Sequence, residues 1–160
     1  MKPFKAASAA SLLFVAIGVT AAPADSYLQP VHVDMMETCK QGLVIWLPRG
    51  KEPKCGQVQT PQVKVFDSAG RLKFVGTGMD ALQWAKSGMP SSPIPNDVVV
   101  RDAASEARIT QVPAPSPGRG WVTYYTTKPC PPCERQLATF RTDVMPKLGV
   151  GTGLSVFDLW

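Results

Sequence analysis

The stretch "YYTTKPCPPCERQLATF" (Tyr124 to Phe140) places two cysteines, Cys130 and Cys133, between a predicted strand and a predicted helix. The residues up to Thr127, "WVTYYTT", are β-branched and aromatic, which is typical of a strand. The residues after Cys133 repeat apolar side chains at helical spacing, with Leu137 and Phe140 on one face. The sequence therefore predicts a Cys-x-x-Cys dithiol at the N-terminus of a helix.

A dithiol at this position has a defined chemistry. Unpaired backbone N–H groups and the helix dipole favour a thiolate at Cys130, which can attack the disulfide of a partner. Cys133, one turn away, can then resolve the mixed disulfide. Pro131 and Pro132 remove two of those N–H groups and leave the ones of Cys133 and Glu134. We therefore expect the pKa of Cys130 to lie only about 1 pH unit below that of a free thiol, which favours a reductase or exchange role over a strong oxidant.

The cysteines also admit other interpretations. An inert structural disulfide has the same spacing as a redox pair, and a Cys-x-x-Cys can be half of a zinc site. The other half is missing, because Cys39 and Cys55 have 15 residues between them and the only histidine is His32. His32, Met35, Met36 and Cys39 include soft ligands for Cu(I), although Met and His near a helix also serve in packing. We expect no metal.

The N-terminus has the layout of a secretory signal peptide. Lys2 and Lys5 precede an apolar run, and small residues follow up to Ala24. The run is short for a membrane span, which argues against an uncleaved anchor. We expect residues 1–24 to be removed and residues 25–160 to form one exported domain, periplasmic or secreted, with no further membrane span. The net charge of +5 falls to about +3 without the two lysines, too mild to indicate a nucleic-acid partner.

The motif "VTYYTTKPCPPC" resembles the strand and active-site turn of glutaredoxins, which belong to the thioredoxin-like superfamily. The resemblance assigns Cys130 as the nucleophile, Cys133 as the resolving thiol and Pro131 as the proline after the first cysteine. Pro132 departs from the usual tyrosine. Tyr124 stands where thioredoxins keep a buried aspartate as proton acceptor, so the resemblance does not carry that role over.

The other half of such a site normally follows the Cys-x-x-Cys segment, but here its counterpart precedes it. "QTPQVKVFDSAGRLKFVGTGMDALQWAKSG" (residues 59–88) resembles the C-terminal half of the family. Thr60-Pro61 matches the cis-proline step, and Gly78 and Asp80 match the turn that opens the last helix and holds glutathione in glutaredoxins. The halves thus stand in swapped order, as in a circular permutation. Alternatively, Pro61 is a trans proline that opens a strand, and the Gly-Asp turn is an ordinary hairpin-to-helix connection.

The resemblance implies an α/β, thioredoxin-like three-layer fold with a four-stranded mixed sheet in permuted strand order. The final strand would lie parallel to residues 121–127, and the hairpin would follow antiparallel. The expected segments are an N-terminal addition (25–58, with a short helix at "VDMMETCKQ" and a strand at "LVIWLP"), the cis-proline hairpin and helix (59–88), a Pro-rich linker with a short hairpin or helix in its middle (89–120), and the strand-helix-strand half (121–160).

The resemblance implies an exported thiol-disulfide oxidoreductase that exchanges disulfides with protein substrates and an upstream redox partner. The expected site residues are Cys130, Cys133 and Pro61 for catalysis, and Thr60, Pro131, Pro132, Gly78 and Asp80 for substrate binding. No cofactor is expected, with glutathione as the one candidate. Cys39–Cys55 would be a structural disulfide or a second redox pair. The alternative function is a non-enzymatic accessory or assembly protein of the cell envelope, with a thioredoxin-like scaffold and structural disulfides.

Overall fold

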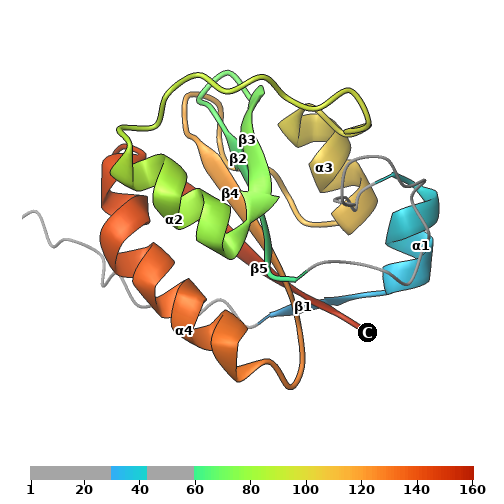
Figure 1. Cartoon of the computed structure of the whole chain (residues 1–160). Coiled ribbons are helices and arrows are strands. Elements are labelled where there is room, and N and C mark those ends of the chain that lie inside the picture. Colours follow the sequence, from blue (N-terminus) through green and yellow to red (C-terminus); the bar gives the residue numbers. More distant parts are fainter. Residues whose placement is uncertain (1–29, 43–59) are drawn as a thin grey trace, which may run out of the picture.

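The computed structural model describes residues 30–42 and 60–160, which contain one five-stranded mixed sheet (Figure 1). Its strands are β1 (Val31–Val33), β2 (Gln62–Phe66), β3 (Leu72–Thr77), β4 (Trp121–Thr127) and β5 (Gly153–Leu159), in the order β1-β5-β4-β2-β3. The helices are α1 (Met35–Lys40), α2 (Gly78–Lys86), α3 (Ala103–Thr110) and α4 (Pro131–Thr139), followed by a π-helical turn η1 (Phe140–Val144) and a 3₁₀ turn η2 (Met145–Lys147).

The hairpin predicted between residues 63 and 75 is confirmed. β2 and β3 pair antiparallel, and the turn between them is closed by Asp67, whose carboxylate accepts the backbone N–H groups of Ala69 and Arg71 at 2.9 Å each. Gly70 has a φ of +76°, a backbone conformation that glycine adopts without steric cost. The "SAG" tripeptide therefore makes the turn because its glycine can adopt a positive φ.

The predicted strand neighbours are also confirmed, but the predicted number of strands is wrong. β5 lies parallel to β4, and β2 lies antiparallel to β4 on its other side. The fifth strand, β1, pairs parallel with the free edge of β5, from Val31 opposite Phe157 to Val33 opposite Leu159. Three residues are too few to show an alternating pattern, so this strand could not be predicted from the sequence. It forms because the edge of β5 offers unpaired backbone groups.

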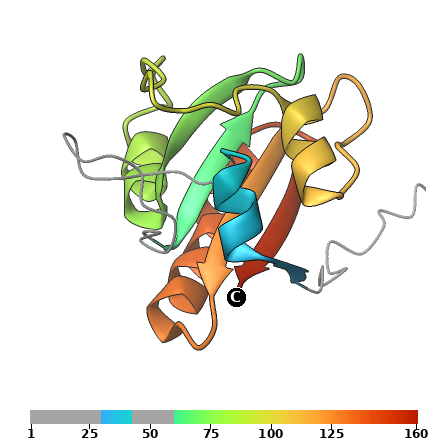
Figure 2. The same cartoon turned by 90° about the vertical axis from the view of Figure 1, so that its right-hand side faces the viewer.

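Helices cover both faces of the sheet. α2, α4 and η1 pack on one face, where the core includes Val63, Phe74, Tyr124 and Phe140. α1 and α3 lie on the opposite face, as the view in Figure 2 shows, over a second core that contains Trp121 and aromatic partners from three strands. A sheet whose central strands are buried on both faces needs apolar residues throughout, which explains why six of the seven residues of β4 are buried.

The helix expected from Cys133 onward is α-helical only as far as Thr139. The chain continues through the π turn η1 and the 3₁₀ turn η2, where Pro146 breaks the pattern as expected. Phe140 and Val144 are nevertheless buried in the core, and Leu137 packs partly against them. The apolar face predicted from the sequence is therefore retained through the change of helical pitch.

The segment predicted as a Pro-rich linker with a short hairpin or helix in its middle contains a helix there, α3, which packs on the sheet. Its N-cap is Asp102, whose carboxylate accepts the backbone N–H of Ser105 at 2.8 Å. The residues around its start bond to the β2–β3 hairpin: Ala103 N–H donates to Gly70 O, and Leu72 N–H donates to Arg101 O. This segment therefore supplies a structural layer of the domain, in addition to its role as a connection.

Replacing Asp102 by Ala is expected to lower the free energy of unfolding by about 1 kcal/mol, because the N-terminus of α3 loses its cap. The hydrogen bond from the Ser105 backbone holds the pKa of Asp102 below its ordinary value. An acid with a depressed folded-state pKa stabilises the fold above its unfolded pKa, and this contribution is lost as pH falls through the folded-state pKa. The difference between wild type and Asp102→Ala in urea unfolding should therefore shrink at acidic pH; an unchanged difference at pH 2–3 would contradict this assignment.

Several expectations fall outside the described residues: the signal peptide at 1–24, the "LVIWLP" strand and Cys55. The short helix expected around "VDMMETCKQ" is confirmed as α1, with Asp34 as its N-cap. Within 30–42 and 60–160, no helix has the length and apolar character needed to cross a bilayer.

Candidate active site

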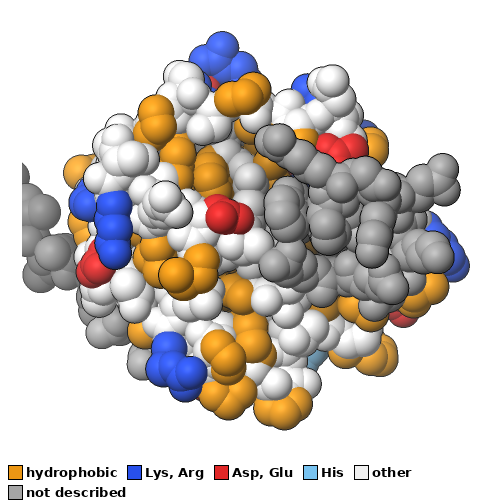
Figure 3. All heavy atoms as spheres, in the orientation of Figure 1, with side chains coloured by type: hydrophobic (Ala, Val, Ile, Leu, Met, Phe, Trp, Pro, Cys, Tyr) orange, Lys and Arg blue, Asp and Glu red, His pale blue; other side chains and the backbone are white. Residues whose placement is uncertain are grey.

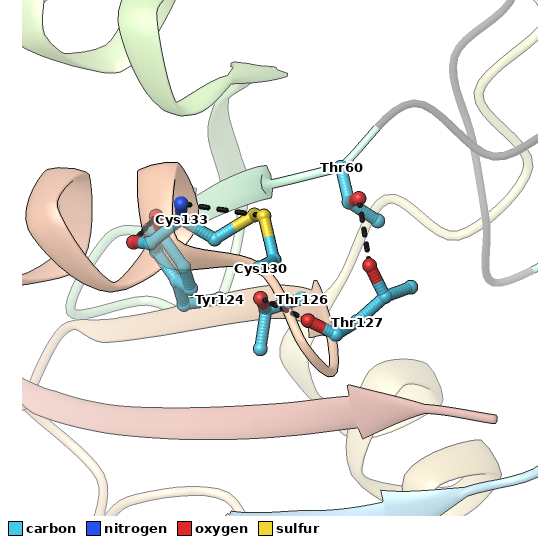
Figure 4. Close-up of a disulfide and its surroundings, with 6 residues drawn as sticks. All are labelled: Thr60, Tyr124, Thr126, Thr127, Cys130 and Cys133. Carbon is cyan, nitrogen blue, oxygen red and sulfur yellow. Dashed lines mark hydrogen bonds between the residues drawn. A yellow bond between two sulfur atoms is a disulfide. The ribbon is translucent and has the colours of Figure 1, made fainter.

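The dithiol lies at the N-terminus of α4, where the sequence predicted it. Cys130 is the N-cap residue, Pro131 and Pro132 occupy the first helical positions, and Cys130 and Cys133 are joined by a disulfide (Figure 4). The two sulfur-bearing residues differ in exposure. Cys130 is half-buried and Cys133 is 1% exposed, so an external reactant meets Cys130 first.

One of the two N–H groups left by the prolines points at the sulfur. The backbone N–H of Cys133 donates to Cys130 Sγ at 3.3 Å. The N–H of Glu134, expected to serve the same thiolate, donates instead to the Cys130 carbonyl oxygen at 3.2 Å, because it closes the first turn of α4. Backbone stabilisation of a Cys130 thiolate would thus rest on one N–H group rather than two.

Tyr124 lies directly beneath the dithiol on β4. Its hydroxyl donates to the Cys133 carbonyl oxygen at 3.0 Å, and burial raises the pKa of Tyr124 well above its ordinary value. Tyr124 is therefore a neutral donor at physiological pH and anchors the first turn of α4 to the sheet. It cannot accept a proton from Cys133 in the way that a carboxylate could.

The Thr60-Pro61 step lies next to the dithiol, and its peptide bond is cis. The Thr60 and Thr127 hydroxyls lie 3.3 Å apart, and Figure 4 shows the two side chains facing each other beside the disulfide. Pro61 is buried, and its carbonyl oxygen accepts the N–H of Gly78 at 3.0 Å. The structure therefore brings the two predicted half-sites together. The Lys128–Pro129 bond, which the sequence did not single out, is also cis.

The Gly-Asp turn at the start of α2 is closed by its own side chains. Asp80 accepts the backbone N–H and the hydroxyl of Thr77 through Oδ2, at 2.9 and 2.8 Å, and its own N–H donates to Thr77 Oγ1 at 3.2 Å. This is a complete capping box. Gly78 is buried against Pro61, whereas Asp80 is exposed. A ligand such as glutathione would have to share or displace the Thr77 contacts to use the Asp80 carboxylate.

Gln136 is a site residue that the sequence reasoning missed. A Cβ atom on Gly78 would lie 2.4 Å from Gln136 Oε1 and 2.8 Å from Pro61 Cγ, so Pro61 and the Gln136 side chain, one turn after Cys133, both pack against Gly78. Its Oε1 is buried and has no hydrogen-bond partner among the described residues. From the sequence, a glutamine in a helix is expected to face solvent. Only the contact of Gln136 with α2 in the folded structure shows that it packs at the site.

Replacing Gly78 by Ala is expected to destabilise the fold by about 1–3 kcal/mol, the usual cost of overpacking a tight contact. In open space the change would be favourable, because alanine is about 1 kcal/mol better than glycine in a helix. Whether Gly78→Ala lowers or raises the free energy of unfolding in urea therefore shows whether Gly78 is in tight contact with its neighbours. Gln136→Ala removes the flexible neighbour, so the double variant should recover part of the loss. A Gly78→Ala variant as stable as wild type would contradict this packing.

The exposed surface around the dithiol combines prolines with the charged side chains of Lys128 and Glu134. Hydrophobic side chains gather at the lower edge of the face in Figure 3, over the start of α4 and its preceding loop, where Pro129, Pro131 and Pro132 are exposed. Exposed apolar side chains beside a reactive group suit contact with another polypeptide.

Among the described residues, no three His, Cys, Asp or Glu side chains gather in a way that could hold a metal ion. Cys39 lies in α1 and His32 in β1, where His32 faces Asp158. Cys55 lies outside the described residues, so the Cys39–Cys55 disulfide stays a prediction.

Comparison of the chain with protein-family models, with curated proteins and with solved structures finds no match.

Proposed function

We propose that this protein is a thioredoxin-like, glutaredoxin-related thiol-disulfide oxidoreductase with its two halves in permuted order. Cys130 attacks and Cys133 resolves, and the partners are thiols and disulfides of other proteins. The observation that carries the proposal is the asymmetric disulfide at a helix N-terminus: Cys130 is half-buried and accepts an N–H at its sulfur, while Cys133 is buried. Such an arrangement favours attack at one sulfur and resolution by the other.

The surroundings of the dithiol support a protein substrate. Thr60 and Pro61 precede the buried strand β2, where Thr60 lies beside Thr127 and Pro61 packs against Gly78. Exposed prolines flank Cys130. An extended substrate segment beside Thr60 would bring its cysteine to Cys130. The strand order β5-β4-β2-β3 is the one that the permuted arrangement requires, and it supports the proposed family. The signal peptide predicted at residues 1–24 supports a proposed location in the periplasm or outside the cell.

A reduction and exchange assay on the full chain tests the function. The protein is equilibrated with graded ratios of reduced and oxidised dithiothreitol, and the state of Cys130 and Cys133 is read by alkylation and peptide mass spectrometry. The proposed function predicts a reversible midpoint and catalysed reduction of insulin disulfides by the reduced protein. A Cys130–Cys133 bond that forms and breaks without accelerating insulin reduction would favour the alternative, an accessory protein with a structural disulfide.

A further inference from the structure

The start of α2 is where the resemblance to glutaredoxins would place glutathione. A γ-glutamyl group needs backbone N–H groups for its α-carboxylate and the Asp80 carboxylate for its ammonium. Here three of the four N–H groups from Thr77 to Asp80 already donate within the protein, to Asp80 Oδ2, to Pro61 O and to Thr77 Oγ1. Asp80 Oδ2 also accepts the Thr77 hydroxyl at 2.8 Å. At most one donor of this turn, the Met79 N–H, is left for a ligand carboxylate.

The space over Gly78 is filled as well. The side chain of Gln136, from the neighbouring helix α4 (Figure 1), lies so close that a Cβ atom on Gly78 would be 2.4 Å from Gln136 Oε1. This oxygen is buried and has no hydrogen-bond partner among the described residues. A carboxylate only accepts hydrogen bonds, so at Gly78 it would meet another acceptor in place of a donor. The turn therefore does not fit the γ-glutamyl group of glutathione.

The exposed part of the same turn is apolar. Met79 is 60% exposed, although it lies between the buried Gly78 and the capping residue Asp80. Pro131 and Pro132 are exposed at the start of α4, the helix that contacts Gly78 through its next turn. A flexible methionine adapts to apolar side chains of different shapes. This surface suits the side chains of a polypeptide better than a small, charged tripeptide.

We propose that Thr77 and Gln136 determine the specificity of the dithiol: they close the start of α2 to glutathione and leave Cys130 to the cysteines of polypeptides. This inference rests on the exchange reaction proposed above and names its substrate class. Thr77 acts by holding the Asp80 carboxylate and N–H in the capping box, and Gln136 acts by filling the space over Gly78. An extended segment beside Thr60 uses neither group, so the closed turn does not impede a protein substrate.

The test compares two substrates that differ only in the γ-glutamyl group. A short unstructured peptide carries its cysteine disulfide-bonded either to glutathione or to N-acetylcysteinylglycine, in which an acetyl group replaces the γ-glutamyl group. Both small thiols keep an amide at the cysteine nitrogen, so their sulfurs have similar reactivity. The reduced full chain is mixed with each substrate, and release of the peptide thiol is followed by chromatography.

In this reaction the Cys130 thiolate attacks the sulfur of the small thiol, and the peptide leaves as a thiolate that takes a proton from water. Cys133 then loses its proton to water and attacks Cys130 Sγ, and the small thiol leaves and is protonated in the same way. One disulfide is reduced to two thiols while the dithiol is oxidised. We expect the glutathione substrate to react no more than about threefold faster than its acetyl counterpart. A larger preference for glutathione overturns the proposal.

Variants that reopen the turn test the two named residues. Thr77→Ala frees the Asp80 carboxylate and N–H, and Gln136→Ala clears the space over Gly78. We expect the double variant to prefer the glutathione substrate by more than about threefold. Thr77→Ser keeps the hydroxyl and should behave as wild type, and so should Asp102→Ala, which removes a helix cap on the other face of the sheet. A folded double variant without the new preference overturns the assignment. If the double variant does not fold, Gln136→Ala alone is held to the same criterion.

A binding measurement separates this inference from the proposed function. S-methylglutathione cannot exchange disulfides, and its binding is read from the amide chemical shifts of Met79 and Asp80. We expect no saturation in the wild type up to about 10 mM. Saturable binding together with intact insulin reduction overturns this inference and leaves the proposed function standing. Absent insulin reduction without binding rejects the proposed function, whereas the closed turn stands.

Discussion

Replacing Cys130 by Ser is expected to abolish insulin reduction to the level of the buffer control, because serine lacks a nucleophilic thiolate at the exposed end of the site. Replacing Cys133 by Ser is expected to have a different consequence. Cys130 would still attack the substrate, but the mixed disulfide could not be resolved from within the protein. The Cys133→Ser variant should therefore accumulate a covalent adduct with its substrate, detectable by mass spectrometry and reversed by dithiothreitol.

The different exposure of Cys130 and Cys133 explains why the two variants should behave differently. Cys130 is half-buried at the N-cap, whereas the Cys133 side chain is 1% exposed and faces the interior beside the helix. A large substrate can reach the first sulfur only. The double variant Cys130→Ser, Cys133→Ser controls for the remaining cysteines of the chain. Adduct formation by Cys130→Ser rather than by Cys133→Ser would reverse the assignment of nucleophile and resolving thiol.

Local patterns predicted much of the architecture. The hairpin follows from alternating residues around a Gly-containing turn, and α2 follows from its apolar spacing and from the acidic residue in its first turn. The parallel pairing of β5 with β4 is the one that the resemblance implies, and the single helical connection between the two strands is compatible with it. These features depend on residues that are close in sequence, so the spacing of residue types in the sequence is enough to predict them.

Contacts between distant segments could not be predicted in the same way. β1 is too short to be periodic, and Gln136 gains its role only from its contact with Gly78. Lys64 shows the same limit. In "VKVFD" it occupies the polar position of an alternating strand, which usually faces water, yet its side chain is 1% exposed. The cause is α3, which arises from a segment whose proline content indicated a linker and which covers that face of the sheet.

Replacing Glu106 by Ala is expected to destabilise the fold by about 3–5 kcal/mol, the usual result of breaking a buried ion pair from one side. Glu106 projects from α3 and is fully buried. Its Oε2 accepts Lys64 Nζ at 2.6 Å, and its Oε1 accepts the hydroxyls of Thr123 at 3.0 Å and of Tyr125 at 2.5 Å. The substitution would leave an ammonium and two hydroxyls buried without their acceptor, a loss comparable with much of the stability of a small domain.

Urea unfolding at neutral pH measures this loss, and a paired substitution provides its control. Lys64→Met with Glu106→Leu removes both charges and keeps the volume apolar, so it should recover most of the stability that Glu106→Ala loses. Thr123→Val removes one hydroxyl donor and should cost only about 1 kcal/mol. A Glu106→Ala variant within 1 kcal/mol of wild type would show that the carboxylate does not hold α3 on the sheet.

The pH dependence of the stability of the Glu106→Ala variant tests the same ion pair independently. Burial lowers the pKa of Lys64 below 10.5, while the charge and hydrogen bond of Glu106 oppose that shift. Without Glu106, the charge and the hydrogen bond that raise the pKa of Lys64 are lost, so this pKa falls further. Between the folded-state pKa and 10.5 the unfolded chain then binds a proton that the folded chain has lost, so stability rises with pH in this window. The defect of Glu106→Ala should therefore become smaller from pH 7 to pH 9.5. A defect that grows over the same range would mean that Lys64 stays protonated in the variant, and that water or another group has replaced the carboxylate.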